Sequence, residues 1–78
     1  MRDEIFAILE EINPEIIKYS GADMLEEGIV DSLEIMEIAT KLEEVFGIEL
    51  TADDVIPENF LNKEEIIRFV EKKISMEN

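Results

Sequence analysis

The sequence predicts an all-α fold, a small four-helix bundle with a long first loop and a short third helix. Apolar residues recur at helical spacing in three segments, over residues 3–12, 32–46 and 62–75. The second and third segments begin with Asp or Asn followed three positions later by Glu, which is the pattern of a capping box. No segment alternates apolar and polar residues as a half-buried strand does.

The first helix is expected over residues 3–12. Its apolar stripe consists of Ile5, Phe6, Ile8, Leu9 and Ile12. Asn13 and Pro14 end this pattern, because proline lacks the amide hydrogen that a helix interior needs. The chain before the next helix has no sustained period, which predicts a long loop with one or two short turns. We expect Ile17 and Leu25 to anchor this loop to the core.

The helix over residues 32–46 is the best-specified element. Asp31 is its expected N-cap, and Glu34 is placed to complete a capping box with it. At about 100° per residue, the core-facing residues occupy an arc of roughly 120°. They are Ile35, Ile38, Ala39, Leu42, Val45 and Phe46. Gly47 is the expected C-cap, because glycine enters the left-handed conformation without strain.

A short third helix and a longer last helix complete the expected bundle. A turn begins in residues 51–54 and Pro57 interrupts it, so only a brief helix fits there. The apolar residues available to fill the core are Val55, Ile56, Phe60 and Leu61. The last helix begins at the capping-box pattern from Asn62 to Glu65 and extends to about Ser75. Its apolar residues are Ile66, Ile67, Phe69, Val70 and Ile74.

Composition excludes several classes of protein. The chain fits one domain, residues 1–78, with one small core. Its formal net charge of -14 argues against nucleic acid and anionic membranes and favours basic protein surfaces as partners. Without cysteine or histidine, disulfides, thiolate chemistry, the usual zinc sites and histidine-based catalysis are excluded. No signal peptide or membrane span is recognised, so we expect a cytoplasmic monomer without membrane insertion.

Ser32 is the candidate functional residue, because its hydroxyl lies at the start of an amphipathic helix. A helix N-terminus presents unpaired backbone N–H groups and the positive end of the helix dipole. A phosphate esterified to Ser32 would therefore lie in a favourable field. A simpler interpretation is that Ser32 only helps to cap its helix, since Asp-Ser commonly begins helices. These residues indicate phosphate anchoring and not catalysis.

A small apolar surface is expected beside this serine. On the helical wheel Leu33, Met36 and Thr40 lie opposite the core arc. Glu37 and Glu44 flank them. Apolar side chains rimmed by carboxylates suit docking to a basic, partly apolar groove of a partner.

Two runs of residues together resemble the acyl carrier protein family, and the match covers most of the chain. They are Glu27-Gly28-Ile29-Val30-Asp31-Ser32-Leu33 and Leu42-Glu43-Glu44-Val45-Phe46-Gly47-Ile48. The resemblance implies an acyl-carrier-like bundle whose motif serine, here Ser32, carries 4'-phosphopantetheine that a phosphopantetheinyl transferase moves from coenzyme A. It also implies that the apolar interior opens to shelter a tethered acyl chain.

The resemblance further assigns roles to residues around the serine. Asp31 would help to position magnesium during the transfer, and no metal site is intrinsic to the chain. Leu33, Met36 and Glu37 would belong to the face that partners recognise. We expect the partner-binding residues to be Asp31, Leu33, Met36, Glu37, Thr40 and Glu44.

The predicted function is that of a carrier and not of an enzyme. Acyl or aminoacyl intermediates would be tethered as thioesters and delivered to loading and processing enzymes with basic docking surfaces. The resemblance implies lipid metabolism, such as fatty acid biosynthesis. Carriers of that pathway typically have Gly-Ala before Asp-Ser-Leu, where this chain has Ile29-Val30, so a specialised stand-alone carrier is slightly favoured. A D-alanyl or other aminoacyl carrier is the alternative, which residues 23–32 resemble equally well.

Two other classes are disfavoured by the residues. An acidic helical calcium-binding or regulatory module is suggested by Asp53, Asp54 and Glu58, but the Asp-x-Asp-x-Asp-Gly loop pattern is missing. An enzyme would need paired carboxylates enclosed in a pocket, and a chain of this size has too little fold to enclose them.

Overall fold

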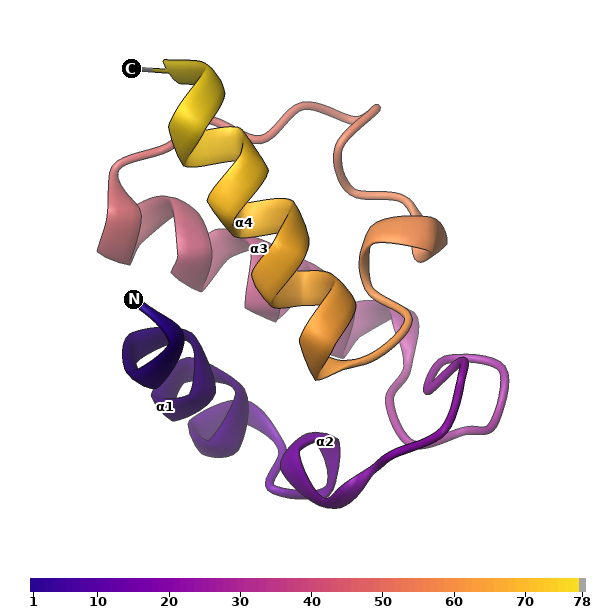
Figure 1. Ribbon diagram of the computed structural model, residues 1–78. Coiled ribbons are helices and arrows are strands. Elements are labelled where there is room, and N and C mark those ends of the chain that lie inside the picture. The colour runs from indigo at the N-terminus through magenta and orange to yellow at the C-terminus, as the bar shows by residue number, and fades with distance from the viewer. Residues whose placement is uncertain (78) are drawn as a thin grey trace.

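The computed structural model describes residues 1–77, which form four α-helices and one 3-10 helix and contain no strand. The elements in chain order are α1 (Arg2–Ile12), α2 (Glu15–Lys18), α3 (Ser32–Phe46), η1 (Pro57–Asn59) and α4 (Lys63–Glu77). The three long helices surround one core, and α2 forms a single turn where the chain leaves α1 for the loop before α3 (Figure 1). The predicted all-α fold with a long first loop and a short third helix is confirmed.

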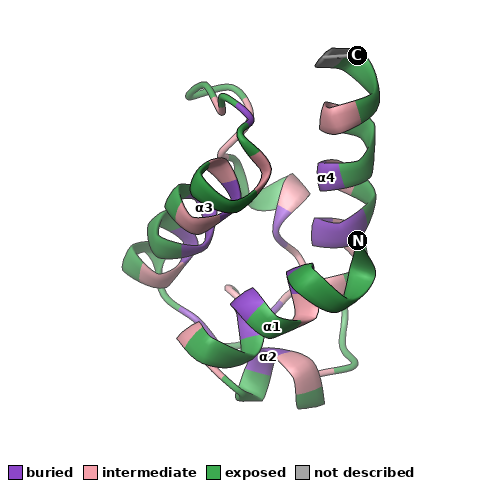
Figure 2. Cartoon of the chain, turned by 90° about the vertical axis from the view of Figure 1, so that its left-hand side faces the viewer, coloured by how far each residue is buried: buried purple, intermediate pink, exposed green. Residues whose placement is uncertain are grey.

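The core receives side chains from all four α-helices and from the segment after η1. The most deeply buried residues include Ile5 and Leu9 of α1, Ile16 of α2, Ile38 and Leu42 of α3, Phe60 after η1, and Ile66 and Val70 of α4. In Figure 2 the buried faces of α1, α3 and α4 turn toward one another. The hydrophobic stripes predicted for these helices therefore meet at one place.

The long loop between α1 and α3 is fixed by two fully buried side chains, Ile16 and Met24. The expected anchors, Ile17 and Leu25, follow them by one residue and are only partly buried against the core. The backbone carbonyl of Met24 accepts hydrogen bonds from the amide groups of the two residues that precede Asp31. These contacts therefore fix the position of the backbone directly before α3.

Two expectations about the core are wrong. Val45 was placed in the core arc of α3, but its side chain is 52% exposed. It lies at the edge of that arc and in the last turn of the helix, where the angular criterion ignores whether another element covers the surface. Ile56 was expected to fill the core and is 37% exposed. The turn in residues 52–54 ends before Pro57, and Pro57 begins η1, because proline suits the first helical position.

Charge is distributed unequally between α3 and α4. α3 contains four glutamates and one lysine, whereas in α4 four glutamates are balanced by four of the seven basic residues of the chain. The two helices lie on opposite sides of the molecule (Figure 2). The side of α3 is therefore more acidic than the side of α4.

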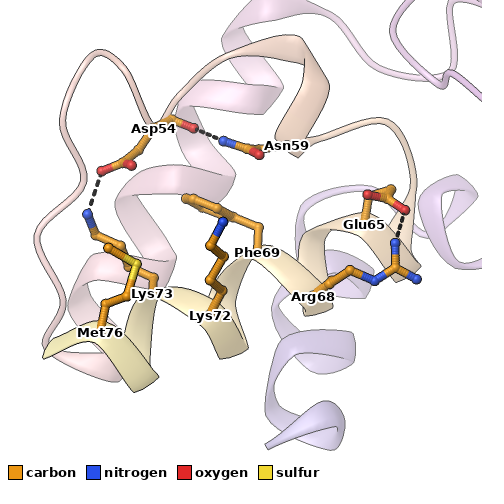
Figure 3. Close-up of a pocket in the computed structure, with 8 residues that line it drawn as sticks. All are labelled: Asp54, Asn59, Glu65, Arg68, Phe69, Lys72, Lys73 and Met76. Carbon is orange, nitrogen blue, oxygen red and sulfur yellow. Dashed lines mark hydrogen bonds and ion pairs between the residues drawn. The ribbon is translucent and has the colours of Figure 1, made fainter. Parts of the chain in front are cut away.

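An ion pair holds the segment before η1 against α4. The Asp54 carboxylate accepts a hydrogen bond from Lys73 Nζ at 2.8 Å (Figure 3). It accepts another from the Thr51 amide at 2.9 Å. The two charged side chains are 20% and 18% exposed. Two hydrogen bonds lower the pKa of Asp54 below its ordinary value of 3.8, and the one from Lys73 has a larger effect than the one from the Thr51 amide.

We expect this ion pair to make stability depend on pH. Because the pKa of Asp54 is lower in the folded state, its contribution is complete above about pH 4 and is lost as the pH falls through the folded value. Asp54→Asn should cost about 1 kcal/mol at pH 7 and much less near pH 2. Asp53→Asn removes the same charge at an exposed neighbour and is the matched control. Urea unfolding at both pH values tests this, and an equal loss at both would contradict it.

Candidate functional site

The start of α3 is a complete capping box. The Asp31 carboxylate accepts a hydrogen bond from the Glu34 amide at 2.9 Å, and the Glu34 carboxylate accepts one from the Asp31 amide at 3.3 Å. Asp31 is extended and is the N-cap, so Ser32 is the first residue within the helix. The side-chain cap comes from Asp31, and the interpretation of Ser32 as a capping residue is not needed.

The Glu34 carboxylate also connects α3 to the end of α1. Asn13, directly after α1, donates from its side-chain amide to Glu34 Oε2 at 3.2 Å and to the Ile29 carbonyl oxygen at 3.0 Å. Just before the cap, Val30 is buried. The backbone on both sides of Ser32 is thus held in place, while Ser32 itself is exposed. The sequence pattern indicates Asn13 only as a helix-ending residue and gives no sign of this contact with α3.

An open groove of about 650 Å³ lies between α1 and α3, and we call it the α1–α3 groove. Its lining residues are Glu11, Ile12, Leu33, Met36, Glu37, Thr40, Lys41 and Glu44. Leu33 and Met36 are 74% and 57% exposed, so the groove presents two large apolar side chains to solvent. The Thr40 hydroxyl donates to the Met36 carbonyl oxygen at 3.0 Å and so stays close to its own helix.

The structure brings five of the six expected partner-binding residues to this groove. Leu33, Met36, Glu37, Thr40 and Glu44 line it. Asp31, the sixth, is engaged in the capping box. The sequence did not predict that two residues of α1 also line the groove, because no local pattern indicates which side of α3 faces α1.

The profile of a protein family described as "Phosphopantetheine attachment site" matches residues 3–63, which is more than half of the chain. The chain belongs to this family. A relative is the D-alanyl carrier protein of Abiotrophia defectiva, which is 26% identical over 77 residues, covering 96% of this chain and 98% of that protein. No solved structure matches the chain.

Membership of the family establishes the cofactor and the class of protein. The cofactor is 4'-phosphopantetheine, and the protein is a carrier without catalytic activity of its own. Carriers of this family are modified by a phosphopantetheinyl transferase and interact with processing enzymes. None of the helices in residues 1–77 has the length and apolar composition needed to cross a membrane.

The start of α3 suits such a cofactor in this carrier. Ser32 offers an exposed hydroxyl at the first position of a 15-residue helix, where the helix dipole favours a phosphate group. The exposed position leaves the phosphate in contact with water, so no burial of its charge is required. Among residues 1–77, no group of three or more Asp or Glu side chains is placed to hold a metal ion.

Proposed function

We propose that Ser32 is the attachment residue for 4'-phosphopantetheine and that the carrier presents an acyl or aminoacyl thioester on it. The observation that supports this most is the exposed hydroxyl of Ser32 directly after the Asp31 cap, within the segment that matches the family. The cofactor supplies the terminal thiol that the chain lacks, since the sequence has no cysteine.

The residues around Ser32 have a positioning role in this proposal. The capping box and Asn13 fix the start of α3, so the base of the flexible arm has a defined place and direction. A docked carrier makes the thioester effectively intramolecular for its partner enzyme, and this raises the local concentration without tight binding. Rigid attachment and a mobile arm therefore serve different steps of the same task.

We further propose that Leu33, Met36, Glu37, Thr40 and Glu44 form a docking surface for basic partners, the transferase first among them. Exposed carboxylates around apolar side chains favour fast, charge-steered and weak association. The proposal includes a monomer, because the net charge of -14 opposes self-association. It also includes a location in the cytoplasm. In the transfer step, Asp31 would help to position magnesium.

For the cargo we propose an aminoacyl group, with D-alanine as the first candidate, because the relative from Abiotrophia defectiva is a D-alanyl carrier protein. A fatty acyl group is the second candidate, because the chain resembles acyl carrier proteins in general, but Ile29-Val30 stands where carriers of fatty acid biosynthesis typically have Gly-Ala. Either group would be attached to the cofactor through the same kind of thioester bond, so the choice between them is made by the enzyme that loads the carrier.

The experiment is reconstitution with purified components. We expect incubation with coenzyme A, magnesium and a promiscuous transferase to add one phosphopantetheine group per chain, measured by intact mass. Peptide mapping should place it on the peptide with Ser32, and modification of Ser20 or Ser75 would refute the assignment. The carrier that bears phosphopantetheine is then incubated separately with a D-alanine-activating enzyme and with a fatty-acid-activating enzyme. Thioester formation only with the second enzyme would refute the aminoacyl cargo.

A further inference from the structure

The α1–α3 groove has two walls, and the docking surface proposed above uses only the wall from α3. The other wall consists of Glu11 and Ile12, the last two residues of α1. Glu11 is exposed and Ile12 is partly buried against the core. Ile12 therefore continues the apolar surface of Leu33 and Met36 across the groove, and Glu11 adds a carboxylate opposite those of α3.

We infer that the end of α1 is a second recognition element for the phosphopantetheinyl transferase. In this inference, an amphipathic segment of the transferase lies in the α1–α3 groove, with apolar side chains on Ile12 and Met36 and basic side chains toward Glu11 and Glu37. The inference rests on the proposed function of Ser32, because the groove begins at the next residue, Leu33.

The charges of the groove select this occupant. Its lining residues carry three carboxylates, Glu11, Glu37 and Glu44, against the single cation of Lys41. A basic segment gains from such a surface. A second copy of this chain would instead place carboxylates opposite carboxylates, which is unfavourable at an interface.

The two walls are also preorganised. The side chain of Asn13, which directly follows the α1 wall, donates to Glu34 in the first turn of α3. This contact fixes the end of α1 beside the start of α3 without a partner. Binding to a groove that is already formed avoids the cost of ordering it.

Two other hollows on the described surface differ from the α1–α3 groove, one in the sign of its charges and the other in its position. The pocket along α4 shown in Figure 3 has a volume of about 360 Å³, and its charges are of both signs, with Arg68 paired to Glu65 and Lys73 to Asp54. A smaller hollow of about 220 Å³ lies between α1 and α2 and includes Glu10. Glu10 thus lies beside Glu11 in the sequence but lines a different hollow.

This arrangement supplies a matched pair of variants. Glu11→Lys reverses a charge in the groove, and Glu10→Lys makes the same change at an exposed position outside it. Both variants have the same net charge, so long-range attraction to a basic transferase changes equally. We expect Glu11→Lys to lower kcat/KM for phosphopantetheine transfer about tenfold, mainly through KM, and Glu10→Lys to lower it less than about twofold.

The measurement is the initial rate of transfer at several salt concentrations, with Glu37→Lys as the reference for the α3 wall. The loss in Glu11→Lys should shrink as salt rises, since exposed charges are screened within about 8 Å at ~0.15 M. If Glu11→Lys and Glu10→Lys have equal rates while Glu37→Lys is impaired, the role of α1 is refuted and the role of the α3 wall is not. Absence of Ser32 modification in the unaltered protein would refute the proposed function instead. A dimer in sedimentation that Glu11→Lys dissociates would show that a second copy occupies the groove, and would also overturn the inference.

Discussion

Ser32→Ala is expected to abolish attachment of 4'-phosphopantetheine completely while the helices remain folded. The variant lacks the hydroxyl oxygen that the phosphate must join, and no neighbouring residue of α3 replaces it. The stability of the helix depends on the Asp31 cap, which the substitution leaves in place. Its cost in free energy of unfolding should therefore be less than about 1 kcal/mol.

Intact mass after incubation with coenzyme A and transferase measures the first effect, and a thermal melt followed by circular dichroism measures the second. The controls are Ser20→Ala and Ser75→Ala, which remove the other hydroxyl groups of this type and should be modified like the unaltered protein. Persisting modification of Ser32→Ala would disprove the assignment. Loss of helicity in this variant would show that Ser32 has a structural role.

Leu42→Ala is expected to produce the largest loss of stability among the substitutions considered for α3. The Leu42 side chain is fully buried in the core, and its truncation should cost about 2 to 5 kcal/mol. Met36→Ala removes a side chain of similar size from the exposed face of the same helix, where 57% of the residue contacts solvent. Its cost should be less than about 1 kcal/mol, because little apolar surface returns to water.

Urea unfolding of both variants gives the two free energies directly, and transfer kinetics of Met36→Ala add a functional measurement. We expect Met36→Ala to be stable but slower in transfer, because it loses apolar contact with the partner. If Met36→Ala unfolds the protein and Leu42→Ala does not, the faces of α3 have been assigned the wrong way round. The docking surface would then have to be abandoned.

Local patterns were sufficient to predict the three long helices, whereas α2 was expected only as a turn in the loop and α4 extends to Glu77, beyond the expected end near Ser75. α3 runs from Ser32 to Phe46, as expected, because its limits depend on a capping box at one end and on Gly47 at the other. Gly47 has φ 64° and ψ 29°, the left-handed conformation that the prediction required. Val45 shows where such patterns fail, because a helical wheel does not reveal how far neighbouring elements cover the last turn.

The candidate site also consists of a part that could be predicted from local sequence patterns and a part that could not. Ser32 and the exposed residues of α3 follow from the sequence near them, and the structure places them as expected. Glu11, Ile12 and Asn13 were not recognised, since their place depends on packing between segments about 20 residues apart. The sequence identified Ser32 as a candidate attachment residue, but it did not indicate that the end of α1 lies beside the groove.

α3 has four glutamates and one lysine, whereas acidic and basic residues balance in α4, and this uneven distribution gives the molecule a permanent electric moment. A positively charged partner exerts a torque on such a moment and turns the carrier before the two surfaces meet. At ~0.15 M salt this torque acts over about 8 Å, so it works only in the last stage of approach. Within that distance, partners with basic surfaces, whatever reaction they perform, should meet the side of α3 first, with Ser32 at its leading end.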